Sequence, residues 1–285
     1  MNFSEQKVLQ GVYCFVFIFL LFMPHTLLLS VSNNPMQPYF LALENDLVGG
    51  TFFFSMFALF GGALFLFLER GNVPKRWHAN VTLAGIICVV AGFNYYFMQG
   101  MYLNTGLSPT RFRYVDWLFT VPMMCTQFYL MLRPAGARPG SLVRLVAAGT
   151  WMIGFGYFGE TTDAYWSIIW GAVSTLGYLV ILYEIWFGPL AKVAERSSSE
   201  EVARAFSYLS YFVLIGWAVY PLGYLTMPFN VFEALHLNRN LVYNFGDVVN
   251  KLGFGLVIYT MARKSARLKK QKRQASSRPL AAALR

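Results

Sequence analysis

The chain has 285 residues, of which 56% are hydrophobic, 18% are aromatic and only 13% are charged. A soluble domain carries about 25% charged residues, so this composition argues against a soluble protein and favours one membrane-embedded domain. The formal net charge of +10 would suit a nucleic-acid partner, but nine Lys and Arg residues and no acidic residue lie between positions 263 and 285. This local excess indicates membrane topology and does not indicate nucleic-acid binding.

The N-terminal region contains a short apolar stretch that ends at Pro24, and Ser30-Val31-Ser32 has the small-x-small pattern of a cleavage site. We therefore predict a signal peptide over residues 1–32 and an extracellular segment over 33–46. The basic region that normally precedes the apolar stretch is reduced to Lys7. An uncleaved helix or an interfacial segment is therefore the alternative.

Seven long apolar segments follow, and each can cross a hydrocarbon core about 30 Å thick as a helix. They lie near residues 47–68, 79–103, 112–132, 142–158, 164–187, 205–227 and 240–262. A helix satisfies its own backbone hydrogen bonds, which the bilayer core cannot do. The sequence therefore predicts an all-α membrane protein, with a seven-transmembrane-helix bundle over residues 47–262 and a basic tail over 263–285.

Charge in the connections predicts the orientation of this bundle. The first connection (ERGNVPKR), the third (RPAGARPG) and the fifth, the polar AERSSSEEVAR, lie on the same side as the basic tail. The opposite side carries Glu160, Asp163 and Glu233 with fewer cations. Since positively charged connections stay in the cytoplasm, we expect a cytoplasmic C-terminus and an N-terminus outside the plasma (inner) membrane.

One Lys, one Arg and two Asp lie inside the third and seventh apolar segments, where a charge is costly. Asp247 and Lys251 are four residues apart, and Arg113 and Asp116 are three apart, so each pair shares a helix face. One interpretation is a buried ion-pair network that only holds helices together. The other is that Lys251 forms an imine with a carbonyl compound, in a site where two carboxylates balance two cations.

Three motifs resemble the helix signatures of microbial rhodopsins, and the proteorhodopsin and xanthorhodopsin group most closely. They are RYVDWLFTVP in the third segment, WAVYP in the sixth and DVVNKLGFG in the seventh. GLSPTRFRYVDWLFTVPMM, FGYFGE and LYEIWFG extend the resemblance, which runs from about residue 47 to 262. It implies a seven-helix bundle with all-trans retinal in its core.

The resemblance also implies a role for each matching residue. Lys251 would attach retinal as a Schiff base, Asp116 would be its counterion and proton acceptor, and Asp247 would be the second counterion. Arg113 would lie beneath them, toward the outside. The residues expected to line the retinal pocket are Tyr95, Trp117, Met124, Trp217, Tyr220, Pro221 and Asn250, and Tyr95, in the second segment, would contact the Asp247 side of the site. Ordinary core packing is the alternative for the aromatic ones, and nonpolar Met124 favours green absorption.

The family's third-helix triad falls on Asp116, Thr120 and Gln127. Asp at the first position favours a proton pump over a chloride pump, and Thr at the second position disfavours a sodium pump. Gln127 departs from proteorhodopsins, which have a carboxylate proton donor there. Because an amide cannot release a proton near neutral pH, we predict slow reprotonation of the Schiff base, accelerated by acid or azide.

Asn94 is a second departure, because proteorhodopsins generally have a His there that bonds the counterion. We therefore expect the counterion to titrate differently from the family pattern, in a direction that the sequence does not fix. The alternative is a small polar residue that bonds within the bundle.

Gly171 lies close to a position where xanthorhodopsin-like proteins have a glycine. A glycine there opens a window on the retinal ring through which a carotenoid antenna can sit. A close helix contact explains a small residue equally well.

We expect an outward light-driven proton pump. The alternative is a slow-cycling photosensory rhodopsin that signals through a partner, which the missing proton donor would suit. An enzyme is disfavoured, because the chain has no nucleotide loop, metal-ligand cluster or catalytic triad, and its histidines are scattered at His25, His78 and His236. The expected partners are membrane lipid, protons and further copies of this chain, with a signalling partner only under the sensor hypothesis.

Overall fold

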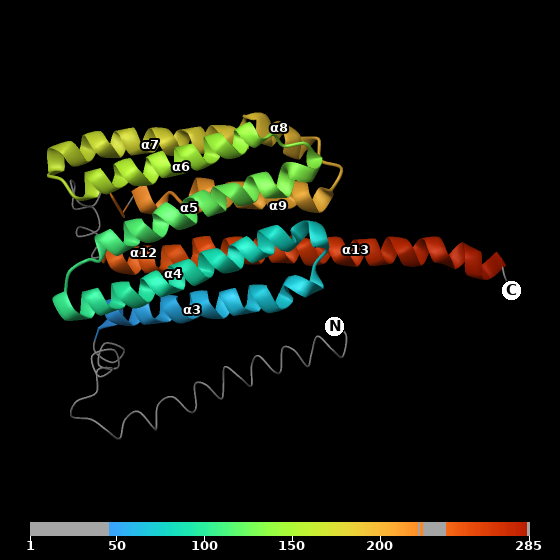
Figure 1. The fold of residues 1–285 in the computed structure, drawn as a ribbon, viewed down its shortest axis with the longest axis horizontal. Coiled ribbons are helices and arrows are strands. Elements are labelled where there is room, and N and C mark those ends of the chain that lie inside the picture. The colour runs from blue at the N-terminus through green and yellow to red at the C-terminus, as the bar shows by residue number, and fades with distance from the viewer. Residues whose placement is uncertain (1–45, 222, 225–237, 284–285) are drawn as a thin grey trace, which may run out of the picture.

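The structure is a computed structural model that describes residues 46–221, 223–224 and 238–283. The expected signal peptide, nearly all of the segment that follows it and Glu233 lie outside the described residues. All regular elements in the described part of the chain are helices. The seven-helix bundle that the sequence predicts is confirmed (Figure 1).

Seven helical stretches form the bundle. The first five are α3 (Leu47–Glu69), α4 (His78–Thr105), α5 (Thr110–Leu132), α6 (Pro139–Glu160) and α7 (Ala164–Trp186). The sixth is α9 (Glu200–Tyr211), which continues into the π-helix η4 (Phe212–Gly216), and the seventh joins α12 (Arg239–Asp247), the π-helix η5 (Val248–Gly253) and α13 (Phe254–Ala283). The connections contain the short elements η1 (Arg70–Asn72), η2 (Lys75–Trp77), η3 (Arg133–Ala135) and α8 (Pro189–Glu195).

Local chemistry fixes where several helices begin and end. Asp46 caps α3 by accepting a hydrogen bond from the Val48 backbone at 2.9 Å, and Asp163 caps α7 through Trp166 at 3.2 Å. Such caps satisfy amide groups that the first turn leaves free. Gly106 ends α4 with a φ of 68°, a left-handed conformation that glycine adopts without strain.

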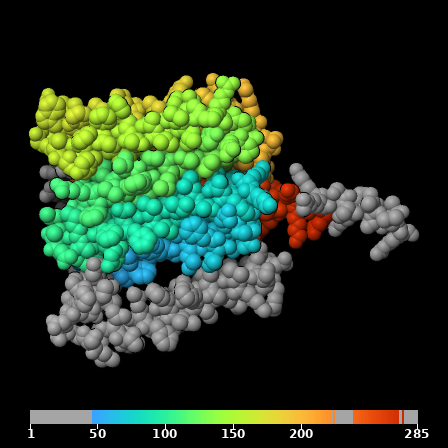
Figure 2. All heavy atoms as spheres, viewed as in Figure 1, coloured from blue at the N-terminus to red at the C-terminus, as the bar shows by residue number. Residues whose placement is uncertain are grey.

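Five helical stretches in the described residues are long and apolar enough to cross a membrane by composition alone. The stretches that fall short are α5 and α12–α13, which carry the buried polar residues Asp116, Gln127, Asp247 and Lys251. Polar residues in such helices face the bundle interior and mark functional sites. Figure 2 shows α4 to α7 packed side by side across the visible face.

Two helices extend beyond the apolar segments that the sequence predicts. The sixth stretch begins at Glu200 and not near 205, because Ser199 lies at its N-cap position and two glutamates occupy the first turn, where negative charge is favourable. The seventh does not end near 262. It continues as α13 to Ala283 and extends away from the bundle (Figure 1), since this basic segment is rich in good helix formers.

Candidate functional site

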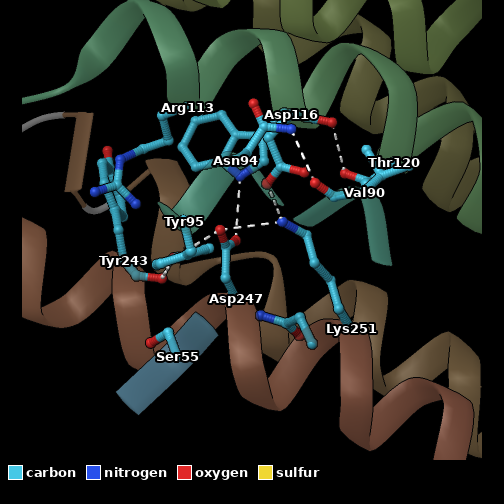
Figure 3. Close-up of polar contacts among 12 residues, drawn as sticks. Ser55, Val90, Asn94, Tyr95, Arg113, Asp116, Thr120, Tyr243, Asp247 and Lys251 are labelled. Atoms are coloured by element: carbon cyan, nitrogen blue, oxygen red, sulfur yellow. Dashed lines mark hydrogen bonds and ion pairs between the residues drawn. The ribbon is translucent and has the colours of Figure 1, made fainter. Parts of the chain in front are cut away.

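Lys251 lies between two carboxylates in the middle of the bundle (Figure 3). Its Nζ forms ion pairs with Asp116 on α5 and with Asp247 on α12, the latter at 3.1 Å. Lys251 is 3% exposed, and both aspartates are fully buried. The sequence therefore brings the third and seventh stretches together through a buried charge cluster, where opposite charges offset the cost of leaving water.

Asp247 accepts hydrogen bonds from three aromatic side chains in addition to its ion pair with Lys251. Tyr95 donates to Oδ2 at 2.9 Å, whereas Trp117 Nε1 and the Tyr220 hydroxyl donate to Oδ1 at 3.1 and 2.7 Å. Hydrogen bonds to an ionised acceptor are stronger than those between neutral groups. The negative charge of Asp247 is therefore held firmly in place.

Asp116 has a different environment. Its Oδ2 pairs with Lys251, and its Oδ1 has no hydrogen-bond partner among the described residues. The Thr120 hydroxyl, one turn further along α5, donates to the backbone carbonyl of Asp116 at 2.9 Å and not to its carboxylate. Of the two carboxylates, Asp116 is thus the one with a free oxygen beside the lysine nitrogen.

Two π-helical turns position the lysine. Asn250 and Lys251 lie in η5, and Asn250 Nδ2 donates to the backbone carbonyl of Gly216, in η4, at 2.9 Å. A Cβ added to Gly216 would lie 2.1 Å from Asn250 Oδ1, so the contact requires glycine. Single π turns are frequent at functional sites because they re-aim side chains within a helix.

Arg113 lies one turn before Asp116 on α5 (Figure 3), and α5 begins at the end of the bundle opposite the C-terminus (Figure 1). It is 1% exposed and donates to Asn240 at 3.2 Å and Asn244 at 3.1 Å. Its guanidinium lies 5.0 Å from the centre of the Tyr243 ring. No ion pair joins it to either aspartate in the part of the chain that the structure describes.

Two further predicted residues lie near the cluster or beyond it. Asn94 donates to the Val90 carbonyl of its own helix at 3.0 Å (Figure 3), which supports its interpretation as a residue that bonds within the bundle. Gln127 is fully buried and donates to the Asn80 carbonyl at 3.0 Å. Its Oε1 has no partner among the described residues.

A cavity of about 330 Å³ lies beside Lys251, between α5, α6, α7 and the sixth stretch. Most of its lining is apolar or aromatic. The predicted pocket residues that line it are Trp117, Met124, Trp217, Tyr220, Pro221 and Asn250. Tyr95 is outside this lining and donates to Asp247, on the side of the site where the resemblance places it.

Gly171 also lines this cavity, and its surroundings support the close-contact interpretation. A Cβ added to Gly171 would lie 2.6 Å from the Tyr224 ring, and one added to Gly159 would lie 1.8 Å from the Tyr224 hydroxyl. That hydroxyl is hydrogen-bonded to Ser167 on α7. The two glycines therefore make room for a tyrosine of the same chain.

Sequence reasoning missed several residues of this site. Trp117 and Tyr220 were expected only as pocket walls, but they also bind Asp247. Asn240 and Asn244, the partners of Arg113, were not expected at all. A signal for them exists: they lie seven and three residues before Asp247, which places them on its helix face.

Comparison with known proteins matches residues 48–265 to the family described as bacteriorhodopsin-like protein. The chain belongs to the bacteriorhodopsin-like family. It is 37% identical over 224 residues to the green-light absorbing proteorhodopsin of Gamma-proteobacterium EBAC31A08, covering 78% of this chain and 89% of that protein. This finding confirms the resemblance that the motifs indicate.

Solved structures of bacteriorhodopsin-like relatives agree with this assignment. The rhodopsin of Exiguobacterium sibiricum superposes with a TM-score of 0.67 at 31% identity, covering 78% of this chain and 98% of that one. Xanthorhodopsin superposes with a TM-score of 0.69 at 24% identity, covering 82% and 97%, and shares the fold. This bacteriorhodopsin-like chain is thus an integral membrane protein.

The cavity fits the retinal that the resemblance implies. Ligand cavities measure roughly 300–1,000 Å³ and are mostly apolar with a few placed polar groups, and the cavity of about 330 Å³ beside Lys251 meets both conditions. Trp117 and Trp217 supply flat aromatic walls, and Lys251 is the one amine in the lining. A long apolar aldehyde could therefore lie in the cavity with its carbonyl carbon at Nζ.

Proposed function

We propose that this protein is a light-driven proton pump that moves protons outward across the plasma membrane, with retinal attached to Lys251. The observation that carries the proposal is the placement of Lys251 Nζ between Asp116 and Asp247, at the end of an apolar cavity. An ion-pair network that only held the helices together would not need a cavity beside its lysine.

Bound retinal would supply light absorption and an all-trans to 13-cis isomerisation beside Lys251 Nζ. The proton released from that nitrogen goes to Asp116, because its Oδ1 is free and its Oδ2 already contacts Nζ. Asp247 keeps its charge because Tyr95, Trp117 and Tyr220 all donate to it. The direction of transfer follows from this difference between the two carboxylates.

The outward route continues from Asp116 toward Arg113. Arg113 Nε and Nη1 and both amide atoms of buried Gln99 have no partner among the described residues. Buried polar groups of this kind normally bind water, so they support a hydrated path on this side. We place this end of the bundle outside the cell and the C-terminus in the cytoplasm, as the charges of the connections indicate.

The inward side supports slow reprotonation of the Lys251 nitrogen. Gln127 occupies the donor position. Its amide donates a hydrogen bond to the Asn80 backbone carbonyl and does not release a proton near neutral pH. A slow cycle would also suit a photosensor that signals through a partner. The amide of Gln127 at the donor position is the observation that favours this second function.

Light-induced pH change in a suspension of expressing cells supplied with retinal tests the proposal. We expect the medium to become acidic on illumination, and we expect a protonophore to abolish the change. A bound pigment without any light-driven pH change would refute the pump and favour the sensor. An alkaline, protonophore-sensitive change would refute the proposed orientation.

A further inference from the structure

A chain of hydrogen bonds crosses the C-terminal end of the bundle. Glu201 Oε2 accepts from the Ser199 hydroxyl at 2.9 Å, and Arg76 Nη2 donates to Ser199 at 2.9 Å and to Ser265 at 2.7 Å. The chain therefore links η2, the start of α9 and α13. Glu201 is only 9% exposed, although it lies in the first turn of its helix.

A cavity of about 90 Å³ lies at this chain of bonds. Its lining includes Arg76, Trp77, Met131, Ser199 and Val202, the neighbour of Glu201. One water molecule needs roughly 10–15 Å³, so the cavity has room for several. Glu201 is not part of this lining, but its hydrogen-bond partner Ser199 is, so the Glu201 carboxylate lies one hydrogen bond from water in the cavity.

Buried polar atoms continue inward from this cavity. Trp77 Nε1, Asn80 Oδ1 and Gln127 Oε1 all lack a partner among the described residues, and all three side chains are at most 2% exposed. Asn80, on α4, follows Trp77, the last residue of η2, by three residues, and Gln127 precedes Met131 by four on α5, so each pair lies about one helical turn apart on one face. Gln127 donates to the Asn80 backbone at 3.0 Å, which joins the two helices.

We propose that Glu201 is the proton-collecting residue of the uptake path, in place of the donor that Gln127 cannot be. The inference rests on the proposed pump. Glu201 takes a proton from cytoplasmic water and gives it to water in the cavity, which returns Glu201 to a carboxylate. The proton then passes Trp77, Asn80 and Gln127 to the Lys251 nitrogen. The cations that face Glu201 are Arg76 on η2 and Lys264 on α13.

Glu200 provides a matched control for this role. It is the preceding residue on the same helix, but its side chain is 64% exposed and pairs with Arg204 one turn along α9. It has the same charge as Glu201, and neither glutamate belongs to the cavity lining, but Glu201 is hydrogen-bonded to the lining residue Ser199 whereas Glu200 pairs with Arg204. Replacing either glutamate by Gln therefore removes one negative charge from the same helix turn, but only Glu201→Gln removes the carboxylate that accepts from Ser199 at the cavity.

Flash photolysis of the retinal-loaded protein near neutral pH compares Glu201→Gln with Glu200→Gln. A positioned proton-transfer group typically contributes about 100-fold or more in rate. Since water still reaches the cavity, we expect Glu201→Gln to slow reprotonation of the Lys251 nitrogen by about 10-fold, and azide to restore the rate. Glu200→Gln should stay within about twofold of the unchanged protein.

Infrared difference spectroscopy gives a readout that a purely structural role would not move. A carboxyl C=O band that rises and falls during the cycle should vanish in Glu201→Gln and persist in Glu200→Gln. If Glu201→Gln does not fold, Glu201→Asp keeps a carboxylate and should shift this band while leaving recovery within about threefold. Slowing that azide does not restore, or equal recovery in both Gln variants, would overturn the inference.

The two proposals fail in different ways. If the unchanged protein binds retinal but moves no protons, the pump is wrong. If it pumps while Glu201→Gln behaves as Glu200→Gln does, only the role of Glu201 is wrong.

Discussion

Asp116 and Asp247 share one lysine but differ in every other contact. Three neutral donors stabilise the charge on Asp247, while one oxygen of Asp116 has no partner among the described residues. The sequence alone identifies both residues and their lysine, because charges inside apolar segments are rare. Only the family resemblance ranks the two carboxylates, because the donors that distinguish them come from three separate helical stretches.

Removing the Asp116 charge tests this ranking. We expect Asp116→Asn to abolish the deprotonated state of the Lys251 nitrogen during the photocycle, because an amide cannot take up the proton. Thr120→Val is the control, since the hydrogen bond that the Thr120 hydroxyl makes among the described residues goes to the Asp116 backbone, and it should change the rate of deprotonation by less than about threefold. Flash photolysis measures both, and unimpaired deprotonation in Asp116→Asn would contradict the ranking.

A carboxylate in place of Gln127 should restore fast reprotonation of the Lys251 nitrogen from the inward side. Gln127→Glu would supply a proton donor at a fully buried site, so we expect the deprotonated state to decay about 100-fold faster and to lose its response to azide. Time-resolved absorption measures this decay. Fast recovery in the unchanged protein, independent of pH, would show that Gln127 does not limit the cycle.

At the scale of elements, two π turns face each other where the sixth and seventh stretches meet. Asn250 joins them by donating to the Gly216 carbonyl. Hydrophobic periodicity predicts both helices but not their π turns. A π turn adds one residue to the helical repeat, and this shift cannot be recognised in a strongly apolar sequence. The apolar pattern does not mark the start of α9 at Glu200 either, because the first turn of this helix is polar. The serine before it and the glutamates in its first turn are nevertheless typical of a helix N-terminus.

Gly216→Ala tests the joint between these turns. The new Cβ would lie 2.1 Å from Asn250 Oδ1, so we expect a loss of about 1–3 kcal/mol in stability and a lower yield of pigment. Gly61→Ala is the control, because a Cβ at Gly61 meets nothing within 4 Å. Thermal unfolding measures both variants, and equal melting temperatures would show that the joint is not tight.

Tyr224 leads to a prediction about a carotenoid antenna. Its ring fills the space beside Gly171 and Gly159, so we expect no energy transfer to retinal when a hydroxylated carotenoid is added. The fluorescence excitation spectrum measures this transfer. A carotenoid band in that spectrum would support the window interpretation and would require Tyr224 to move.

At the scale of the whole molecule, two groups of charges differ in their setting. One is the buried cluster around Lys251, and the other is the basic surface that continues along α13 beyond the bundle. The sequence predicts the seven-helix architecture because the bilayer restricts the alternatives so strongly. The sequence predicts the charge of the tail but not that the tail is helical. The seventh helix is predicted from its apolar residues, and these stop where the basic tail begins.

The central claim is that Lys251 carries retinal, and reductive trapping tests it most directly. Treating the retinal-loaded protein with borohydride under illumination, followed by proteolysis and mass spectrometry, locates the modified residue. We predict one retinyl group, on the peptide that contains Lys251, and none in a Lys251→Ala variant. A retinyl group on another lysine, or no covalent adduct in a coloured protein, would contradict the account.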